Sequence, residues 1–300
     1  MEVRYMLLLA ALALVCPFLF GRKRRYRASA YCRMTGNPYR LTMEDKGRFG
    51  EYQIYRRLAA YEKKDAGFLF NCYLPKRSGE TTEVDVIMLH TSGIYVFESK
   101  NYSGRIFGRE EERTWVQCLR KGQGSVLKEH FLNPLLQNQA HVAQVRRLLG
   151  LREQVPVYSL AVFSDRCTVK KISLSDPDRC VTTWRRLRRA VRKFARRQPD
   201  ALTREEVETF YGRLYPYTQV SEETRQEHIR NLQRRRKKQG IFRRILAWLL
   251  GGCFRKKRCP WCGALLVRRN VRQGPRKGVA FYGCSAYPAC RYTRSLEERP

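Results

Sequence analysis

The chain has 300 residues, of which 61 are Lys or Arg and 27 are Asp or Glu, so its formal net charge is +34. This excess of basic residues indicates a polyanionic partner, either nucleic acid or an anionic membrane surface. Hydrophobic residues make up 43% of the chain, which is enough for a folded domain of ordinary size between its two ends. Most of the eleven cysteines are scattered without the spacing of a disulfide framework, which favours a reducing, cytoplasmic setting.

An unbroken apolar run from Met6 to Phe20 opens the chain, and five basic residues follow it within positions 22–27. The run lies at the short end of the roughly 17–25 residues that cross a bilayer. Basic residues that flank a membrane span stay on the cytoplasmic side. An apolar run followed by basic residues therefore predicts a single-pass anchor at residues 5–21 in the cell membrane, with the rest of the chain in the cytoplasm. A cleaved signal peptide and a soluble chain are the alternatives, but a signal peptide carries its charges before the apolar run.

Residues 22–42 are basic and contain turn residues, so they are expected to form an irregular linker. A helix is predicted from about residue 43 to residue 61, because apolar residues recur three, four and seven positions after Glu51. Glu51 therefore projects with the apolar stripe of this helix. That is an unusual place for a carboxylate unless a site needs it there.

Short runs of apolar or alternating residues between turn signals predict a series of strands. They cover residues 68–74, 83–89, 94–100, 115–119, 157–163 and 180–182. A helix is predicted between the fourth and fifth strands, with Asn133 as its N-cap, Pro134 as its first residue and Gly150 as its stop. Because the strand at 157–163 is apolar throughout, we expect a sheet that is covered on both faces.

Acidic and basic side chains are expected to converge on two of these strands. Glu98 and Lys100 stand at i and i+2 of one strand and share a face, while Asp85 lies on the preceding strand, across the turn that contains Gly93. Two adjacent carboxylates repel unless a cation bridges them, and hard oxygen ligands suit Mg2+. A lysine on the same face can position or deprotonate an attacking water, and Glu51 can add a further carboxylate. Read alone, Glu-x-Lys is also explained by a salt bridge along a strand.

A wider pattern surrounds these residues: KGRFGEYQIYRRL, then TTEVDVIMLHTSGIYVFESKNYSGRIFG, then NPLLQNQAHVAQVRRLL. Over about residues 44–165 it resembles the nuclease-related domain (NERD), a member of the PD-(D/E)xK restriction-endonuclease-like superfamily. The resemblance implies a mixed sheet flanked by helices. It also implies that Asp85 and Glu98 bind a catalytic Mg2+, that Lys100 is the catalytic lysine and that Glu51 is the helix-borne acid.

Two further positions follow from the resemblance. Gln137 matches the family's polar residue on the helix after the core strands and is expected to contribute to the site. Ser99 stands where the family commonly has a small apolar residue, but it faces away from the site. His141 lies one turn after Gln137 and either faces the same cleft or lies on the surface.

The region after the last strand is strongly basic. Residues 184–197 combine an apolar stripe with a dense set of Lys and Arg, which predicts an amphipathic helix whose outer face is either solvated or contacts nucleic acid. Residues 203–238 are expected to be helical and exposed. The apolar segment at 241–250 is too short to span a membrane and either lies in the membrane interface or caps the domain.

Two cysteine pairs near the C-terminus have the spacing of a metal site. Cys259 and Cys262 are separated by two residues, and Cys284 and Cys290 by five, each pair in turn-prone sequence. Four thiolates in two short pairs predict a tetrahedral Zn2+ site, and so small a segment depends on the metal for most of its folding free energy. Four unrelated buried cysteines are the alternative.

The segments CPWCGALLVRR and FYGCSAYPACRYT resemble the zinc ribbon at the C-terminus of bacterial type IA DNA topoisomerases, over about residues 257–295. The resemblance implies binding of single-stranded DNA, for which aromatic rings and basic groups are suited. The candidate contacts are Arg268, Arg269, Arg272, Arg276, Lys277, Tyr282, Tyr287 and Tyr292. Aromatic residues in a small ribbon can also be structural. A chain of 300 residues has no room for the catalytic domains of a topoisomerase.

The predicted fold class is α/β, a restriction-endonuclease-like mixed sheet flanked by helices, with an N-terminal transmembrane helix and a small zinc ribbon. The predicted parts are an anchor at 5–21, a basic linker at 22–42, a NERD-like core at 43–165, a helical and basic part of the core at 166–230, a basic or amphipathic linker at 231–256 and the ribbon at 257–295. The predicted function is Mg2+-dependent phosphodiester hydrolysis by a membrane-anchored DNA-binding protein. The alternative is a non-catalytic protein that binds or tethers nucleic acid at the membrane.

Overall fold

The computed structural model describes residues 21–64, 66–120, 126–170, 172–234, 258–271, 273 and 278–295. Its α-helices are α2 (Ala30–Thr35), α3 (Tyr39–Glu44), α4 (Lys46–Leu58), α5 (Pro134–Leu149), α6 (Trp184–Ala195) and α7 (Arg204–Leu214), with further helical residues at 21–27 and 222–234. Two 3-10 helices are η1 (Ala59–Lys64) and η3 (Tyr215–Thr218).

The strands form three sheets. The first contains β1 (Gly67–Pro75), β2 (Thr81–His90), β3 (Gly93–Lys100), β7 (Val157–Phe163) and β9 (Arg179–Thr183), in that spatial order. The second contains β6 (Val126–Leu132), β5 (Thr114–Arg120), β4 (Gly104–Phe107) and β8 (Cys167–Val169). The third, in the C-terminal module, contains β10 (Leu266–Asn270), β11 (Ala280–Cys284) and β12 (Thr293–Ser295).

The first sheet is mixed, as the resemblance to the nuclease-related domain implies. Strands β1, β2 and β3 pair antiparallel, whereas β7 and β9 continue the sheet in parallel with β3. The turn between β2 and β3 needs Gly93, because its φ is +125° and a Cβ there would lie 2.7 Å from the carbonyl oxygen of Pro156. This turn fixes the register of the two strands that carry the acidic residues.

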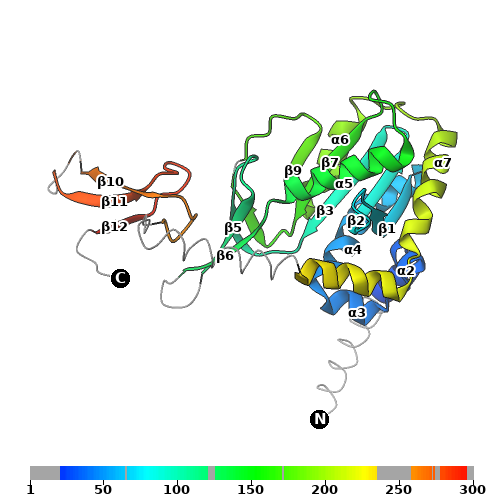
Figure 1. Cartoon of the computed structure of the whole chain (residues 1–300), viewed down its shortest axis with the longest axis horizontal. Helices are drawn as coiled ribbons and strands as arrows, with labels where there is room; N and C mark the ends of the chain where they lie inside the picture. The colour runs from blue at the N-terminus through cyan, green and yellow to red at the C-terminus, as the bar shows by residue number, and fades with distance from the viewer. Residues whose placement is uncertain are drawn as a thin grey trace, which may run out of the picture.

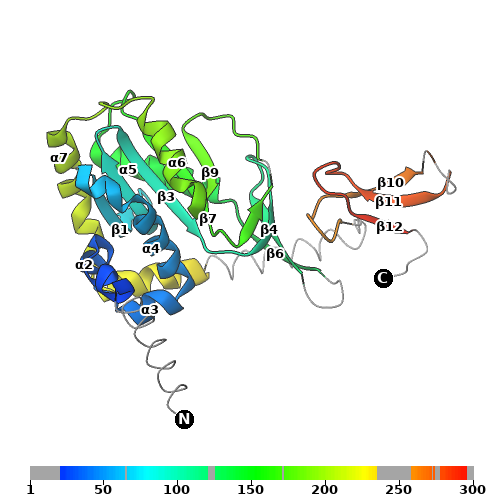
Figure 2. The ribbon, with the colours of Figure 1, turned by 180° about the vertical axis from the view of Figure 1, so that it is seen from behind.

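Helices cover both faces of the first sheet (Figures 1 and 2). Helices α5 and α7 cover one face, where Val96, Val145 and Leu149 belong to a single buried cluster. Helices α2, α4 and α6 cover the other, where Ile54 and Phe97 are fully buried together. Burial on both faces explains why all seven residues of β7 are buried.

Helix α5 confirms the predicted end signals. The side chain of Asn133 accepts a hydrogen bond from the backbone N–H of Leu135, Pro134 is the first helical residue, and Gly150 ends the helix with φ +61°. Helix α6 buries Trp184, and the eight basic residues between positions 185 and 197, six in the helix and two directly after it, are all exposed. This exposed basic side of α6 is called the α6 basic face below.

The prediction of an irregular linker at 22–42 is wrong. Residues 21–27, α2 and α3 are helical, and Tyr26 and Tyr31 are fully buried in the same cluster as Ile54. The turn residues there are helix caps, because Gly36 ends α2 with φ +66° and Pro38 begins α3. These segments pack on the domain as its outer layer.

Other expectations need smaller corrections. The part at 166–230 is not only helical, since β8 and β9 lie in it and β9 completes the first sheet. The helix expected at 203–238 is interrupted by η3. The predicted anchor lies outside the described residues except for Gly21, as do most of the linker at 231–256 and all of 241–250. Within the described ranges, no helix has both the length and the apolarity to cross a bilayer.

Candidate functional site

The predicted acidic residues meet where β2 and β3 separate. Backbone pairing between these strands ends at Val86 and Phe97, and Asp85 and Glu98 are the next residues on the two arms. The carboxylate oxygen Oδ2 of Asp85 accepts a hydrogen bond from the backbone N–H of Ser99 at 2.7 Å. A side chain therefore takes a place that a ladder carbonyl would otherwise fill, and the two strands part around it.

A second irregularity lies opposite Asp85 on β1. The register of β1 and β2 pairs the residues on either side of Asn71 and Asp85 but not these two, and Asn71 has φ +51°. Such a backbone is strained for most residues but tolerated by Asn. Before this point Phe70 faces the α4 side of the sheet, and after it Cys72 faces the α5 side. The face to which the side chains of β1 point therefore changes at Asn71, the residue opposite Asp85.

Glu98 and Lys100 share a face of β3, as the alternation predicts. The Nζ atom of Lys100 lies 2.5 Å from Oε1 of Glu98. The other oxygen, Oε2, lies 3.5 Å from Nδ1 of His141 on α5. Both of these atoms are buried, and neither has a hydrogen-bond partner among the described residues. His141 is only 5% exposed, so the structure places it beside Glu98 and not on the surface.

Glu51 approaches the same region from α4, where Asp45 caps the helix by accepting from the backbone N–H of Arg48. Glu51 as a whole is 8% exposed, and its carboxylate accepts a hydrogen bond from the hydroxyl of Tyr31 at 3.0 Å. Burial raises the pKa of Glu51 to about 7, although hydrogen bonds from Tyr31 and Asn71 act against the rise. The carboxylate thus titrates near neutral pH.

The electrostatics of the site are those of crowded carboxylates. Burial, followed by the charges of Glu98 and Glu51, raises the pKa of Asp85 well above its usual value, and Lys100 offsets only part of this. Burial alone would lower the pKa of Lys100, but Glu98 and Asp85 reverse this and raise it, so the lysine stays charged at neutral pH. Burial lowers the pKa of His141 and favours its neutral form.

The donor set fits a divalent cation of the Mg2+ class. Asp85 and Glu98 supply hard oxygen atoms, the charges of Glu98 and Glu51 disfavour ionisation of Asp85, and Oε2 of Glu98 has no hydrogen-bond partner among the described residues. The carboxylates are not gathered as tightly as a formed cluster. Among the described residues, the four cysteines near the C-terminus form the only group of three or more such side chains whose ligand atoms all lie within 4.8 Å of one another.

Gln137 is half-buried on α5, one turn before His141. Its neighbour Asn138 is buried and donates to the carbonyl oxygen of Val96 at 2.8 Å, which fixes α5 against β3. Sequence reasoning did not identify Tyr31 or Asn71 as parts of the site. Tyr31 lies in the segment that was expected to be a linker. The only sequence signal for Asn71 is that it is a polar residue within an apolar strand.

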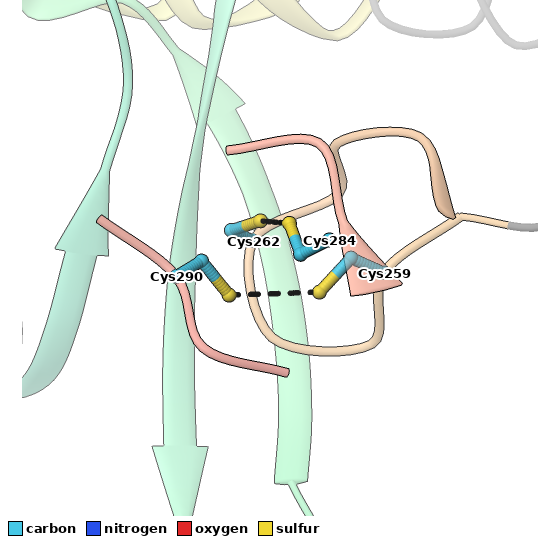
Figure 3. A group of neighbouring side chains, drawn as sticks. All are labelled: Cys259, Cys262, Cys284 and Cys290. Carbon is cyan, nitrogen blue, oxygen red and sulfur yellow. Dashed lines mark hydrogen bonds between the residues drawn. The ribbon is translucent and has the colours of Figure 1, made fainter. Parts of the chain in front are cut away.

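The four C-terminal cysteines converge in Figure 3, as their spacing predicts. Sγ of Cys262 lies 3.1 Å from that of Cys284, and Sγ of Cys259 lies 3.7 Å from that of Cys290. Backbone N–H groups of Trp261 and Ala286 donate to the sulfurs of Cys259 and Cys284, each at 3.4 Å. Such bonds support the thiolate forms that bind a metal. Four sulfur ligands are a set that Zn2+ prefers.

The predicted nucleic-acid contacts lie on two faces of the ribbon sheet. On one face Tyr282 is opposite Arg268 on β10 and opposite Arg294 on β12. This row is the Tyr282 face.

On the other face, the guanidinium of Arg269 lies 5.6 Å from the ring centre of Tyr287, a ring that is 58% exposed. Phe281, Gly283 and Arg291 line the same hollow. This hollow is the Tyr287 face. Tyr292 instead packs edge-on against Trp261 at 5.4 Å, beside the cysteines. Arg272, Arg276 and Lys277 lie outside the described residues.

The comparisons with known proteins agree with this division. The family model of the nuclease-related domain (NERD) matches residues 46–164, and the model described as topoisomerase DNA binding C4 zinc finger matches residues 256–299. The two matches confirm both resemblances found in the sequence, and they support nucleic-acid binding.

Two curated proteins are similar, and both are uncharacterized. One from Bacillus anthracis is 27% identical over 194 residues, which are 65% of this chain and 87% of that protein. The protein YrdD of Escherichia coli is 54% identical over 39 residues, which are 13% of this chain and 19% of YrdD. No solved structure matches the chain.

Proposed function

We propose that this chain, which carries a nuclease-related domain followed by a C4 zinc ribbon, is a membrane-anchored nuclease that hydrolyses phosphodiester bonds of DNA with the help of a divalent metal. One observation carries the proposal: Asp85, Glu98 and Lys100 meet at the point where β2 and β3 part, with Glu51 and His141 approaching from helices on opposite faces. A mixed sheet with this arrangement supports a restriction-endonuclease-like core.

The residues divide the chemistry among themselves. Asp85 and Glu98 would hold Mg2+, which when bound lowers the pKa of water and offsets charge on the phosphate. Because Lys100 stays protonated, we assign it the role of positioning the water and offsetting negative charge rather than that of a base. Glu51, whose pKa is about 7, is suited to accept a hydrogen bond from the attacking water.

Substrate binding is assigned to basic and aromatic surfaces away from the carboxylates. The zinc ribbon offers an exposed ring on its Tyr287 face, a partly exposed ring on its Tyr282 face and arginines on both, which suit stacking bases and the phosphates of single-stranded DNA. The α6 basic face adds positive charge for the backbone of nucleic acid. Membrane anchoring through residues 5–21 rests on the apolar run and the basic residues that follow it.

A cleavage assay tests the proposal. The full chain, purified in detergent, is incubated with labelled single-stranded DNA, double-stranded DNA and RNA in the presence of Mg2+, Mn2+ or chelator. We expect metal-dependent cleavage that Lys100→Met abolishes and that Lys63→Met, a change at an exposed lysine of η1, leaves intact. If the wild-type chain binds DNA but cleaves none of the substrates with either metal, the non-catalytic tethering function replaces the nuclease.

A further inference from the structure

Helix α2 lies outside the matched domain, which begins at residue 46, yet it reaches the candidate site. The hydroxyl of Tyr31 lies 3.0 Å from Oε2 of Glu51 and 3.2 Å from the carbonyl oxygen of Arg48. A phenol has one proton, and the shorter contact with the stronger acceptor is to the carboxylate. Tyr31 therefore donates to the acid that α4 places in the site.

The position of Tyr31 is fixed by packing. Its ring is fully buried and contacts Phe70 of β1 edge-on, with ring centres 4.9 Å apart. Ser29 caps α2 by accepting from the backbone N–H of Cys32. The hydroxyl of Tyr55 on α4 accepts from the backbone N–H of Ala30 at 3.1 Å. These contacts bind α2 to the same helix that carries Glu51.

We infer that Tyr31 is a positioning residue for Glu51, and that the juxtamembrane segment 21–44 is thereby an integral part of the catalytic unit. The inference rests on the proposed nuclease function for its effect on turnover, but the contact between the two side chains can be tested without it. The segment that follows the predicted anchor directly thus also orients a carboxylate of the site.

Tyr31 matters because Glu51 is otherwise unfavourably placed. The other groups that act on its carboxylate are Asn71 on β1, which donates to it, and three acids, Glu83, Asp85 and Asp45, whose charges oppose its ionisation. Removing the hydroxyl of Tyr31 leaves burial and these charges unchanged but takes away a hydrogen bond to the ionised form. The pKa of Glu51 should then rise above about 7.

The test compares Tyr31→Phe with Tyr26→Phe in the full chain. Tyr26 is an equally buried tyrosine of the same cluster whose hydroxyl bonds to Thr42 and Asn37 and not to Glu51, so it controls for the loss of a buried hydroxyl. In the cleavage assay, Tyr31→Phe should lower kcat about fivefold at pH 7, because a rise of one unit in the pKa of Glu51 leaves about a fifth of the ionised form, and should regain most of it at pH 9. Tyr26→Phe should keep the wild-type pH profile.

A second measurement does not depend on activity. Carbon-13 NMR of the carboxyl groups of labelled glutamate, with the Glu51 signal identified by its loss in Glu51→Gln, reports the titration of Glu51 directly. Tyr31→Phe should move its midpoint upward by about one pH unit, and Tyr26→Phe should not. An unmoved midpoint, or an equal shift in both variants, overturns the inference. If the wild type cleaves nothing, the proposed function fails while the NMR titration still decides the role of Tyr31.

Discussion

The carboxylate of Asp85 accepts a hydrogen bond from the backbone N–H of Ser99, so this one side chain both ends the pairing of β2 with β3 and lies next to Glu98 in the site. This hydrogen bond gives Asp85 a structural role that is separate from any role in metal binding. Its carboxylate satisfies a backbone donor, whereas its negative charge is opposed by Glu98 and Glu51. The two parts can be separated by substitution.

The first prediction separates them with Asp85→Asn and Asp85→Ala. Both changes should abolish cleavage, because neither side chain is an anionic ligand. Asn keeps an oxygen that can accept the hydrogen bond from the backbone N–H of Ser99, and it removes the repulsion between Asp85 and the neighbouring carboxylates. The free energy of unfolding of Asp85→Asn should therefore be at least that of the wild type, and higher by up to about 1 kcal/mol. Ala leaves the N–H of Ser99 without its partner and should be less stable than Asn by about 1 kcal/mol.

Urea denaturation of the full chain at pH 8, without divalent metal, measures both differences. An Asp85→Asn variant clearly less stable than the wild type would show that the charge of Asp85 supports the fold. The metal-site assignment would then lose its electrostatic argument.

The second prediction concerns pH and Glu51. Its pKa in the fold is about 7, above the ordinary value of 4.5, so folding favours the protonated form. The stability that this contributes is fully present below about pH 4.5 and is lost as the pH rises through 7. The wild type should therefore lose stability relative to Glu51→Gln between pH 5 and pH 8, by an amount on the order of 2 kcal/mol.

Thermal or urea unfolding of the two proteins across this pH range gives the difference curve, in which the other titrating groups cancel. A flat difference would mean that Glu51 ionises normally in the fold. A curve of the opposite sign would mean that its neighbours stabilise the carboxylate instead of opposing it.

The parts of the site on β2 and β3 could be predicted because local rules place them. Strand alternation puts Glu98 and Lys100 on one face, and the turn at Gly93 sets Asp85 on the neighbouring arm. The cysteine spacing predicts the metal cluster by the same kind of local argument. Each inference needs only positions that are close in the sequence or in a single hairpin.

The parts on helices could not be predicted in the same way. Whether His141 faces Glu98 depends on how α5 rotates against the sheet, and its neighbours in sequence do not decide that. Tyr31 was missed because basic residues and the turn signals of Gly36 and Pro38 resemble those of a linker. Its burial results from tertiary contacts with α4 and β1. Such contacts override local composition.

The third prediction is that one Zn2+ binds per chain through the four cysteines. Cys284→Ser should release the metal and unfold the ribbon alone, because a binding free energy of roughly 10 kcal/mol or more is its main support. Metal analysis and hydrogen exchange of the full chain measure the two effects. Zinc retained in Cys284→Ser, or loss of protection in the first sheet, would contradict the assignment. Cys180→Ser, at a cysteine far from the cluster in sequence, is the control.

The fourth prediction distinguishes the two ribbon faces. The Tyr287 face forms a hollow with an exposed ring beside Arg269, whereas the ring of Tyr282 is only partly exposed between two arginines. We therefore expect Tyr287→Ala to weaken binding of single-stranded DNA by roughly 1–3 kcal/mol and Tyr282→Ala to weaken it less.

Fluorescence anisotropy with labelled oligonucleotides at several salt concentrations measures these affinities. Arg269→Gln should also reduce the slope of log affinity against log salt by about one, because one phosphate contact is lost. Equal effects of the two tyrosines would mean that DNA uses both faces, and a larger effect of Tyr282 would assign the site to the Tyr282 face.

The last prediction concerns membrane topology, which decides whether the nuclease-related domain and the ribbon can meet DNA. The basic residues at positions 22–27 resist translocation and should hold everything after Gly21 in the cytoplasm, together with DNA and reduced thiols. Protease added to intact cells should then leave the body undigested, while the same protease after permeabilisation digests it. Alkaline carbonate should fail to strip the protein from membranes. Digestion in intact cells would reverse the topology and contradict the proposal of a nuclease that acts on cytoplasmic DNA, whereas release by carbonate would contradict only the proposed anchor.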